Sequence, residues 1–145
     1  MKIDSSAVLQ AEKEILISAP IEKVWVEITQ IDQWPQWQPD VTSAQVDGAL
    51  AAGTQFHWKA KGLNITSTLQ AVEPMQRIGW TGNSIGMHAV HIWTFETREG
   101  GTYVKTEESL SGWFPWILKR FDPKFLEKSL QNSLQVLKSH VEGLS

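Results

Sequence analysis

Two ionisable side chains, those of His91 and Glu108, are the groups in this chain best suited to acid–base chemistry. Each lies in a segment where residues alternate as in a β-strand, so every second side chain points to the same face of a sheet. The alternation predicts that both point to the face that carries the aromatic residues. An ionisable group among aromatic side chains loses hydration, which shifts its pKa and lets it donate or accept a proton in a cyclisation or dehydration.

A purely structural role for these two residues is the alternative. His91 could form a hydrogen bond with a neighbouring strand, and Glu108 could pair with Lys119 or Arg120 at the edge of the site. Structural ion pairs also perturb pKa values. The sequence therefore leaves both roles open.

A serine-hydrolase pattern also occurs in the chain. Gly82-Asn83-Ser84-Ile85-Gly86 matches G-x-S-x-G, and Asp122 and His140 follow in the order of a catalytic triad. A nucleophile elbow requires a turn from a strand to a helix, whereas this segment is predicted to join two strands. The pattern is therefore interpreted as an ordinary turn.

Composition argues against several other classes of function. The absence of cysteine removes disulfides, thiolate catalysis and cysteine metal sites, and His88 and His91 should face opposite sides of one strand, so no metal and no cofactor is expected. With 13 basic and 16 acidic residues, the chain lacks the basic excess of nucleic-acid-binding proteins. Met1 to Glu14 does not resemble a signal peptide and no segment could span a membrane, so we expect a cytoplasmic protein.

The elements that must position these residues are mostly strands. The pattern predicts seven of them, the last six in an unbroken antiparallel meander, with two short helices after the first strand. The predicted strands are Ala11–Ser18, Val41–Asp47, Thr54–Lys61, Ile65–Glu73, Arg77–Thr81, Met87–Arg98 and Thr102–Leu110, and the short helices are Pro20–Thr29 and Ile31–Trp37. No linker or shift in composition divides residues 1–145, which predicts one domain with its core at about residues 11–142.

A long amphipathic helix is predicted from Asp122 to Leu144. Asp122 is expected to cap it, Pro123 to occupy its first position and Gly143 to mark its end. Its apolar residues recur at steps of three and four, which places them on one face. They are Leu126, Leu130, Leu134, Leu137, Val141 and Leu144.

Eight tryptophans in so short a chain favour a core with a large aromatic-lined space. Trp25, Trp34 and Trp37 are expected to fix the short helices to the sheet, and the tryptophans of the inner strand faces to line a cavity. The segment Ser111–Arg120 holds three aromatic residues around a proline, and one interpretation of it is a mobile apolar flap at the entrance. The basic residues Lys119, Arg120, Lys124 and Lys128 are interpreted as a solvated face rather than as a site for an anionic ligand.

These elements, in this order, resemble the SRPBCC superfamily, which includes START lipid-transfer domains, birch-pollen-allergen-type proteins and polyketide cyclase/dehydrase-like proteins. The resemblance spans about residues 11–142. The residues that carry it are ISAPIEKVWVEIT followed by WPQWQPDV, Glu73-Pro74 before IGW, His91-Ile92-Trp93-Thr94-Phe95, and Gly101-Thr102-Tyr103-Val104 followed by Glu107, Glu108 and Gly112. It implies an α+β helix-grip fold, in which a strongly bent sheet grips the long C-terminal helix around a cavity for an apolar or amphipathic small molecule.

We therefore expect the polyketide cyclase-like branch and a ligand held between sheet and helix. The predicted ligand contacts are Phe56, Trp58, Leu69, Ile78, Trp80, His91, Trp93, Phe95, Val104, Thr106, Glu108, Leu126, Leu130, Leu134 and Leu137. One alternative is an enzyme on the same scaffold with His91 and Glu108 as acid and base. A third is an interaction module in which Trp113, Phe114 and Trp116 dock a protein or a membrane surface. Homodimerisation is left open.

Overall fold

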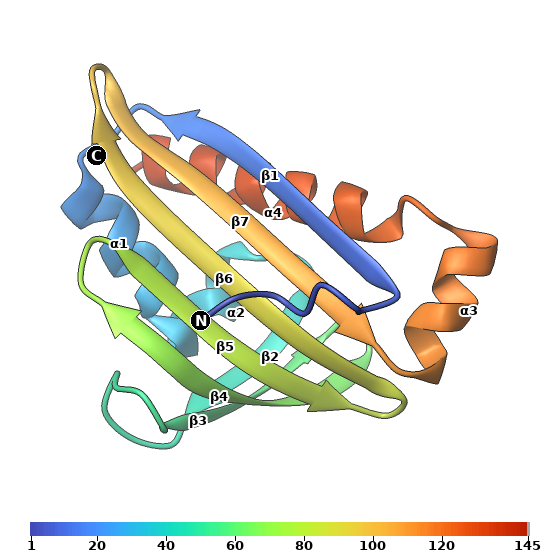
Figure 1. Cartoon of the computed structure of the whole chain (residues 1–145). Coiled ribbons are helices and arrows are strands. Elements are labelled where there is room, and N and C mark those ends of the chain that lie inside the picture. The colour runs from blue at the N-terminus through green and yellow to red at the C-terminus, as the bar shows by residue number, and fades with distance from the viewer. Residues whose placement is uncertain (145) are drawn as a thin grey trace.

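The computed structural model describes residues 1–144, which form a seven-stranded sheet and a set of helices (Figure 1). The strands are β1 (Leu9–Ile17), β2 (Val41–Val46), β3 (Gln55–Ala60), β4 (Leu63–Glu73), β5 (Arg77–Ser84), β6 (Met87–Arg98) and β7 (Gly101–Ser111). The helices are α1 (Ile21–Thr29), a 3₁₀ turn (Ile31–Gln33), α2 (Trp34–Trp37), α3 (Trp113–Phe121) and α4 (Phe125–Glu142).

The strand order is β1-β7-β6-β5-β4-β3-β2, and all neighbouring strands are antiparallel. The six strands from β2 to β7 form the predicted meander, and β1 returns to pair with β7. The register between β4 and β5 shifts between Leu69 and Ala71, which is a β-bulge of the kind that bends a strand. The predicted α+β helix-grip fold is confirmed.

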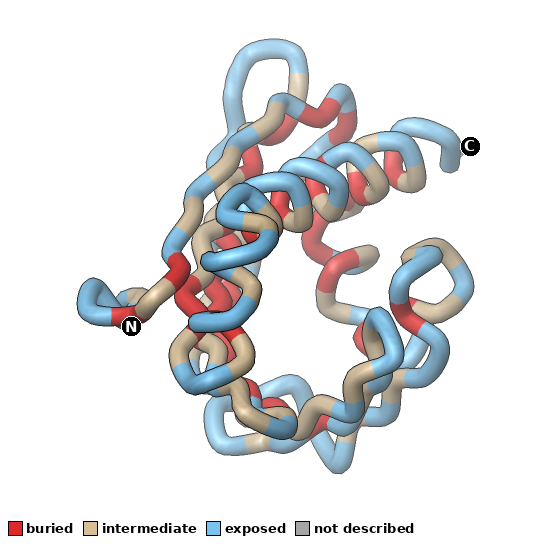
Figure 2. Tube along the Cα trace, turned by 90° about the vertical axis from the view of Figure 1, so that its right-hand side faces the viewer, coloured by how far each residue is buried: buried red, intermediate tan, exposed pale blue. Residues whose placement is uncertain are grey.

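Helix α4 lies against β1 and β7, with its buried residues on the side turned to the sheet (Figure 2). It ends as predicted, with Gly143 as its C-cap. Its start is corrected: α4 begins at Phe125, so Pro123 lies before the helix, and Asp122 is instead the C-cap residue of α3. The Asp122 carboxylate accepts a hydrogen bond from Lys128 Nζ at 3.1 Å, and no side chain caps the start of α4. Leu144 lies beyond the helix and is exposed.

Most of the segment Ser111–Arg120, interpreted as a flap, is part of helix α3, which the sequence did not predict. Pro115 lies in the first turn of α3, where a missing backbone N–H costs little. Gly112 precedes the helix with φ = 113°, a conformation that side chains other than glycine rarely adopt. The proline and the glycine of this segment thus mark the start of a helix.

The core consists of two clusters of buried residues. The larger contains α1, α2, the middle of the sheet and the last part of α4, with Leu134, Leu137 and Val141. The smaller consists of Leu9, Leu110, Leu126 and Leu130. The leucine stripe of α4 therefore divides between the two clusters.

Candidate functional site: a cavity between the sheet and the C-terminal helices

A cavity of about 300 Å³ lies between the inner face of the sheet, α3 and α4. Its walls are mostly apolar and contain three tryptophans of the sheet, Trp58, Trp80 and Trp93. The other lining residues are Ile28, Trp34, Gln38, Pro39, Asp40, Val41, Ala60, Lys61, Leu63, Ile65, Met87, His91, Glu108, Leu110, Phe114, Leu118, Phe125, Leu126, Ser129, Leu130, Asn132, Ser133 and Val136. Such a lining, apolar with a few polar groups, is typical of small-molecule sites.

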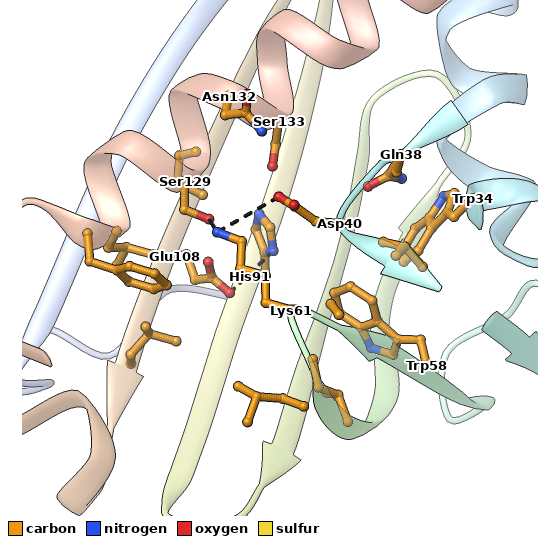
Figure 3. Close-up of a pocket in the computed structure, with 18 of the residues that line it drawn as sticks. Trp34, Gln38, Asp40, Trp58, Lys61, His91, Glu108, Ser129, Asn132 and Ser133 are labelled. Carbon is orange, nitrogen blue, oxygen red and sulfur yellow. Dashed lines mark hydrogen bonds and ion pairs between the residues drawn. The ribbon is translucent and has the colours of Figure 1, made fainter. Parts of the chain in front are cut away.

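Strand pairing brings the two ionisable residues together. His91 on β6 is directly opposite Glu108 on β7 and opposite Trp80 on β5. Directly opposed residues of an antiparallel pair point to the same face. His91 Nδ1 lies 3.4 Å from Glu108 Oε2 (Figure 3). The alternation of the sequence and the register of the strands thus agree on this pair.

His91 is buried between two indole rings. Its ring centroid lies 5.1 Å from that of Trp80 and 5.4 Å from that of Trp93. His91 Nε2 lies 2.7 Å from the hydroxyl of Thr106 on β7, so the hydrogen bond to a neighbouring strand that the structural alternative required is present. Burial lowers the pKa of His91 from 6.5 to about 3, because the imidazolium would lose its hydration.

Glu108 also favours its neutral form. Burial raises the pKa of its carboxyl group to about 8, and the positive charge of Lys61 only partly opposes this. Although His91 and Glu108 are within ion-pair distance, burial disfavours both charged forms, so at neutral pH the pair is an imidazole beside a protonated carboxyl group. In a consistent arrangement, Nε2–H of His91 donates to Thr106 and Nδ1 accepts from Glu108.

Lys61 extends across the cavity mouth from the turn between β3 and β4 (Figure 3). Its Nζ donates to Ser129 Oγ of α4 at 3.2 Å and lies 3.9 Å from Asp40 Oδ2. The same ammonium group lies 4.8 Å from the centre of the Phe125 ring, within range of a cation–π interaction. Gln38, Asn132 and Ser133 complete a polar rim around an apolar interior. Glu108 faces this lysine rather than Lys119 or Arg120, which the sequence offered as partners.

The tryptophan walls are held in place by specific contacts. Trp58 Nε1 donates to Ser67 Oγ at 3.0 Å. Gly82 on β5 makes this possible, because a Cβ at that position would lie 2.9 Å from the same oxygen. Trp34 packs edge-on against Trp58 at 5.3 Å and tilted against Trp80 at 5.6 Å. Trp34 thus fixes α2 to the sheet, as predicted, and also forms part of the cavity wall.

Seven of the fifteen predicted ligand contacts line the cavity: Trp58, Trp80, His91, Trp93, Glu108, Leu126 and Leu130. The other eight point inward but do not line it, because neighbouring side chains fill the space around them. These are Phe56, Leu69, Ile78, Phe95, Val104, Thr106, Leu134 and Leu137. Phe95, for example, packs against Trp25 at 5.5 Å, and Thr106 lies behind His91.

The sequence analysis did not identify the residues of the polar rim. For those on α4, their spacing along the chain could have indicated their position. Ser129, Ser133 and Val136 recur at steps of four and three, so they form a second stripe on α4 beside the leucines. Lys61 carried no such signal. Its position depends on a turn in which it adopts φ = 51°, and turns of this kind leave no periodicity.

The structure does not form the triad. Gly82 to Ser84 are the end of β5. His140 Nε2 lies 2.6 Å from Glu27 Oε1 of α1, and the His140 ring stacks on Trp37. Asp122 pairs with Lys128. Within residues 1–144, no group of three or more His, Asp or Glu side chains is placed to hold a metal ion, and no helix is both long and apolar enough to cross a bilayer.

Comparison with known proteins gives a family match over most of the chain. Residues 9–142 match the family described as "Polyketide cyclase / dehydrase and lipid transport". No curated protein matches the sequence.

Solved structures give the same fold at low identity. A hypothetical protein, jhp0584, from Helicobacter pylori superposes with a TM-score of 0.85 at 18% identity, covering 96% of this chain and 91% of that one. A START superfamily protein from Mycobacterium smegmatis gives 0.76 at 14%, covering 94% and 99%. The di-domain ARO/CYC BexL from the BE-7585A biosynthetic pathway gives 0.71 at 17%, covering 97% of this chain and 53% of that one. These likenesses show a shared fold.

Proposed function

Because the chain belongs to the polyketide cyclase / dehydrase and lipid transport family, we propose that it binds an apolar or aromatic small molecule in the cavity between the sheet and α4. The observation that carries this proposal is the cavity itself, about 300 Å³ lined by four tryptophans and bordered at its mouth by polar side chains. Its volume lies at the lower end of the range of about 300–1,000 Å³ that is typical of small-molecule pockets. The ligand is therefore compact.

Binding would be driven by burial of apolar surface, which contributes about 25 cal/mol for each Å² removed from water. The buried pair would orient the ligand. A protonated Glu108 can donate a hydrogen bond, and its neutral state accommodates an uncharged acceptor such as a carbonyl oxygen. Lys61 at the mouth would meet a second, polar or anionic end of the molecule. The ligand that fits is amphipathic, with a neutral acceptor inside and its polar end at the rim.

Catalysis by the same pair is the second candidate. A protonated carboxyl group beside an imidazole, 3.4 Å apart in a buried site, can act as a general acid next to a potential base. The pKa of about 3 argues against His91 as that base, because so weak a base rarely accepts a proton at neutral pH. Binding is therefore the function that the geometry supports best.

Native mass spectrometry of the purified protein tests the binding proposal. The expected spectrum contains a species heavier than the chain by the mass of a small molecule, which disappears when the same sample is denatured. Extraction of the sample with an organic solvent should recover that molecule. A bare chain that also fails to bind apolar probes would reject the proposal.

A comparison of Glu108→Gln with the wild type separates binding from catalysis. Glutamine keeps a hydrogen-bond donor but cannot release a proton. If the protein only binds, the variant should retain the ligand with a similar affinity. Loss of turnover of a cyclising substrate with binding preserved would instead establish the enzyme.

A further inference from the structure

Five apolar side chains are exposed together at the α3 end of the molecule. Ile85 and Phe121 are each 80% exposed, Trp113 60%, Trp116 56% and Ile117 40%. We call these five residues the α3 face. Monomeric proteins rarely expose clusters of large apolar side chains, and where such clusters occur they mark interaction sites.

Specific contacts hold the residues of the α3 face in place. Phe114 N donates to Gly86 O at 3.0 Å, which joins the start of α3 to the turn between β5 and β6 that carries Ile85. The Trp113 ring packs directly on Gly86, where a Cβ would lie 2.3 Å from it. The opposite side of α3 is occupied, because Phe114 and Leu118 line the cavity. Phe114, predicted to dock a partner, therefore faces inward.

Positive charge lies beside these aromatic residues. Residues 113–128 contain four basic and two acidic residues, in a chain whose net charge is −3. The basic residues are Lys119, Arg120, Lys124 and Lys128, all of them exposed. Of the two acidic residues, Asp122 is paired with Lys128 at 2.9 Å. The cationic character is thus local to this end of the molecule.

We propose that the α3 face is a docking surface for a phospholipid bilayer that contains anionic lipids. Tryptophan and phenylalanine side chains partition into the boundary between headgroups and acyl chains, and Lys and Arg beside them are attracted to anionic headgroups. The α3 face projects from a helix and the neighbouring β5–β6 turn instead of forming a groove, as insertion into a bilayer requires. The inference does not depend on whether the cavity is occupied.

Docking in this orientation has a geometric consequence. One side of α3 would rest on the bilayer while its other side, Phe114 and Leu118, remains part of the cavity wall. Only one helix would separate the bilayer from the cavity. This arrangement would suit a protein that exchanges an apolar molecule with a membrane.

Co-sedimentation with vesicles tests the proposal. The wild type should sediment with mixed phosphatidylcholine–phosphatidylglycerol vesicles, weakly with pure phosphatidylcholine, and less at high salt. The double variant Trp116→Ser/Phe121→Ser should lose sedimentation, and Lys119→Glu/Arg120→Glu should lower the partition coefficient for the anionic vesicles by about tenfold or more. None of these four residues lines the cavity, so binding of an apolar probe should be unchanged.

Matched controls are available elsewhere on the surface. Val26 and Leu50 are exposed apolar residues away from α3, and Lys59 is an exposed lysine of β3. Val26→Ser/Leu50→Ser and Lys59→Glu should sediment like the wild type. No sedimentation of the wild type would overturn the proposal. So would control variants that lose as much binding as the α3 variants, or a wild-type dimer that the α3 variants dissociate without any vesicle binding.

Discussion

The pair of His91 and Glu108 combines opposite pKa shifts with one common cause. His91 is buried and the side chain of Glu108 is mostly covered, and both lie in the aromatic-lined cavity, where each charged form would lose hydration. The pKa of the base falls and that of the acid rises, so both groups are neutral at pH 7. A cavity wall on which this pair is neutral is suited to an uncharged part of a ligand.

These shifts predict a stability profile with two slopes. Between pH 6.5 and about 8, Glu108 keeps its proton in the folded state but has lost it in the unfolded state, so stability falls as pH rises. The slope is at most about 1.4 kcal/mol per pH unit. Between pH 4.5 and about 3, unfolded His91 is protonated while folded His91 is not, so stability falls as pH falls. Between pH 4.5 and 6.5 the two contributions cancel.

Urea unfolding of the wild type and of Glu108→Gln across this range measures the effect. The difference in free energy of unfolding between the two proteins should change between pH 6.5 and 8, because only the wild type loses stability there through this residue. Other titrating groups are common to both proteins. Parallel profiles over that interval would mean that Glu108 is ionised in the folded protein.

Sequence reasoning identified this pair because strands impose a strict alternation. It also placed Trp58, Trp80 and Trp93 on the correct face. It did not distinguish residues that line the cavity from residues packed beside it, since Phe56 and Leu69 share the same alternation but are fully covered. That distinction depends on how side chains fill three-dimensional space. Alternation carries no information about it.

At the scale of elements, the start of α3 is fixed by two close backbone approaches. Gly112 would place a Cβ 2.3 Å from Gly86 O, and Gly86 would place one at the same distance from the Trp113 ring. The sequence showed only three aromatic residues around a proline and predicted a flap. It could not show that Trp113 packs on a glycine, Gly86, that lies 27 residues earlier in the chain.

Substitution of Gly86 by alanine tests the packing of Trp113 on this turn. Gly86 has φ = 70° and Gly100, in the turn between β6 and β7, has φ = 88°, but a Cβ at Gly100 would meet open space. Gly100→Ala should cost only the strain of a left-handed conformation, about 1–2 kcal/mol. Gly86→Ala should cost about 1–3 kcal/mol more, because it also displaces Trp113. Equal losses in urea unfolding would show that the packing of Trp113 on the turn contributes little.

The helix boundaries illustrate the same limit at element scale. The leucine stripe identified α4 and Gly143 its end, yet Asp122 was assigned to the wrong helix end. An aspartate followed by proline is a good start signal for a helix. The signal cannot reveal that a second helix ends at the same residue.

At the scale of the whole molecule, the cavity lies between two parts of one core. The large cluster is anchored by Trp34, which contacts Phe56, Trp58 and Trp80 edge-on or tilted at 5.3 to 5.7 Å. The small cluster holds the first part of α4 against β1 and β7. The cavity, with His91 and Glu108 in its wall, lies between these two clusters.

Two tryptophan substitutions should differ greatly in their effect on stability. Trp34 is 2% exposed and Trp116 56% exposed. Trp34→Ala should destabilise the fold by about 3–5 kcal/mol. Trp116→Ala should change the free energy of unfolding by no more than about 0.5 kcal/mol. Thermal and urea unfolding check this, and similar losses for both would contradict the assignment of Trp116 to the α3 face.

The central claim is that the space between sheet and helix holds a ligand, and a probe titration tests it most directly. Ser133 lines the cavity on α4, and Gln131 is exposed on the same helix away from it. The affinity of an apolar fluorescent probe would be measured for the wild type, Ser133→Trp and Gln131→Trp, with unfolding curves showing that all three are folded. We expect Ser133→Trp to lose the probe and Gln131→Trp to bind it like the wild type. Equal binding by all three folded proteins would place the probe outside the cavity and contradict the account.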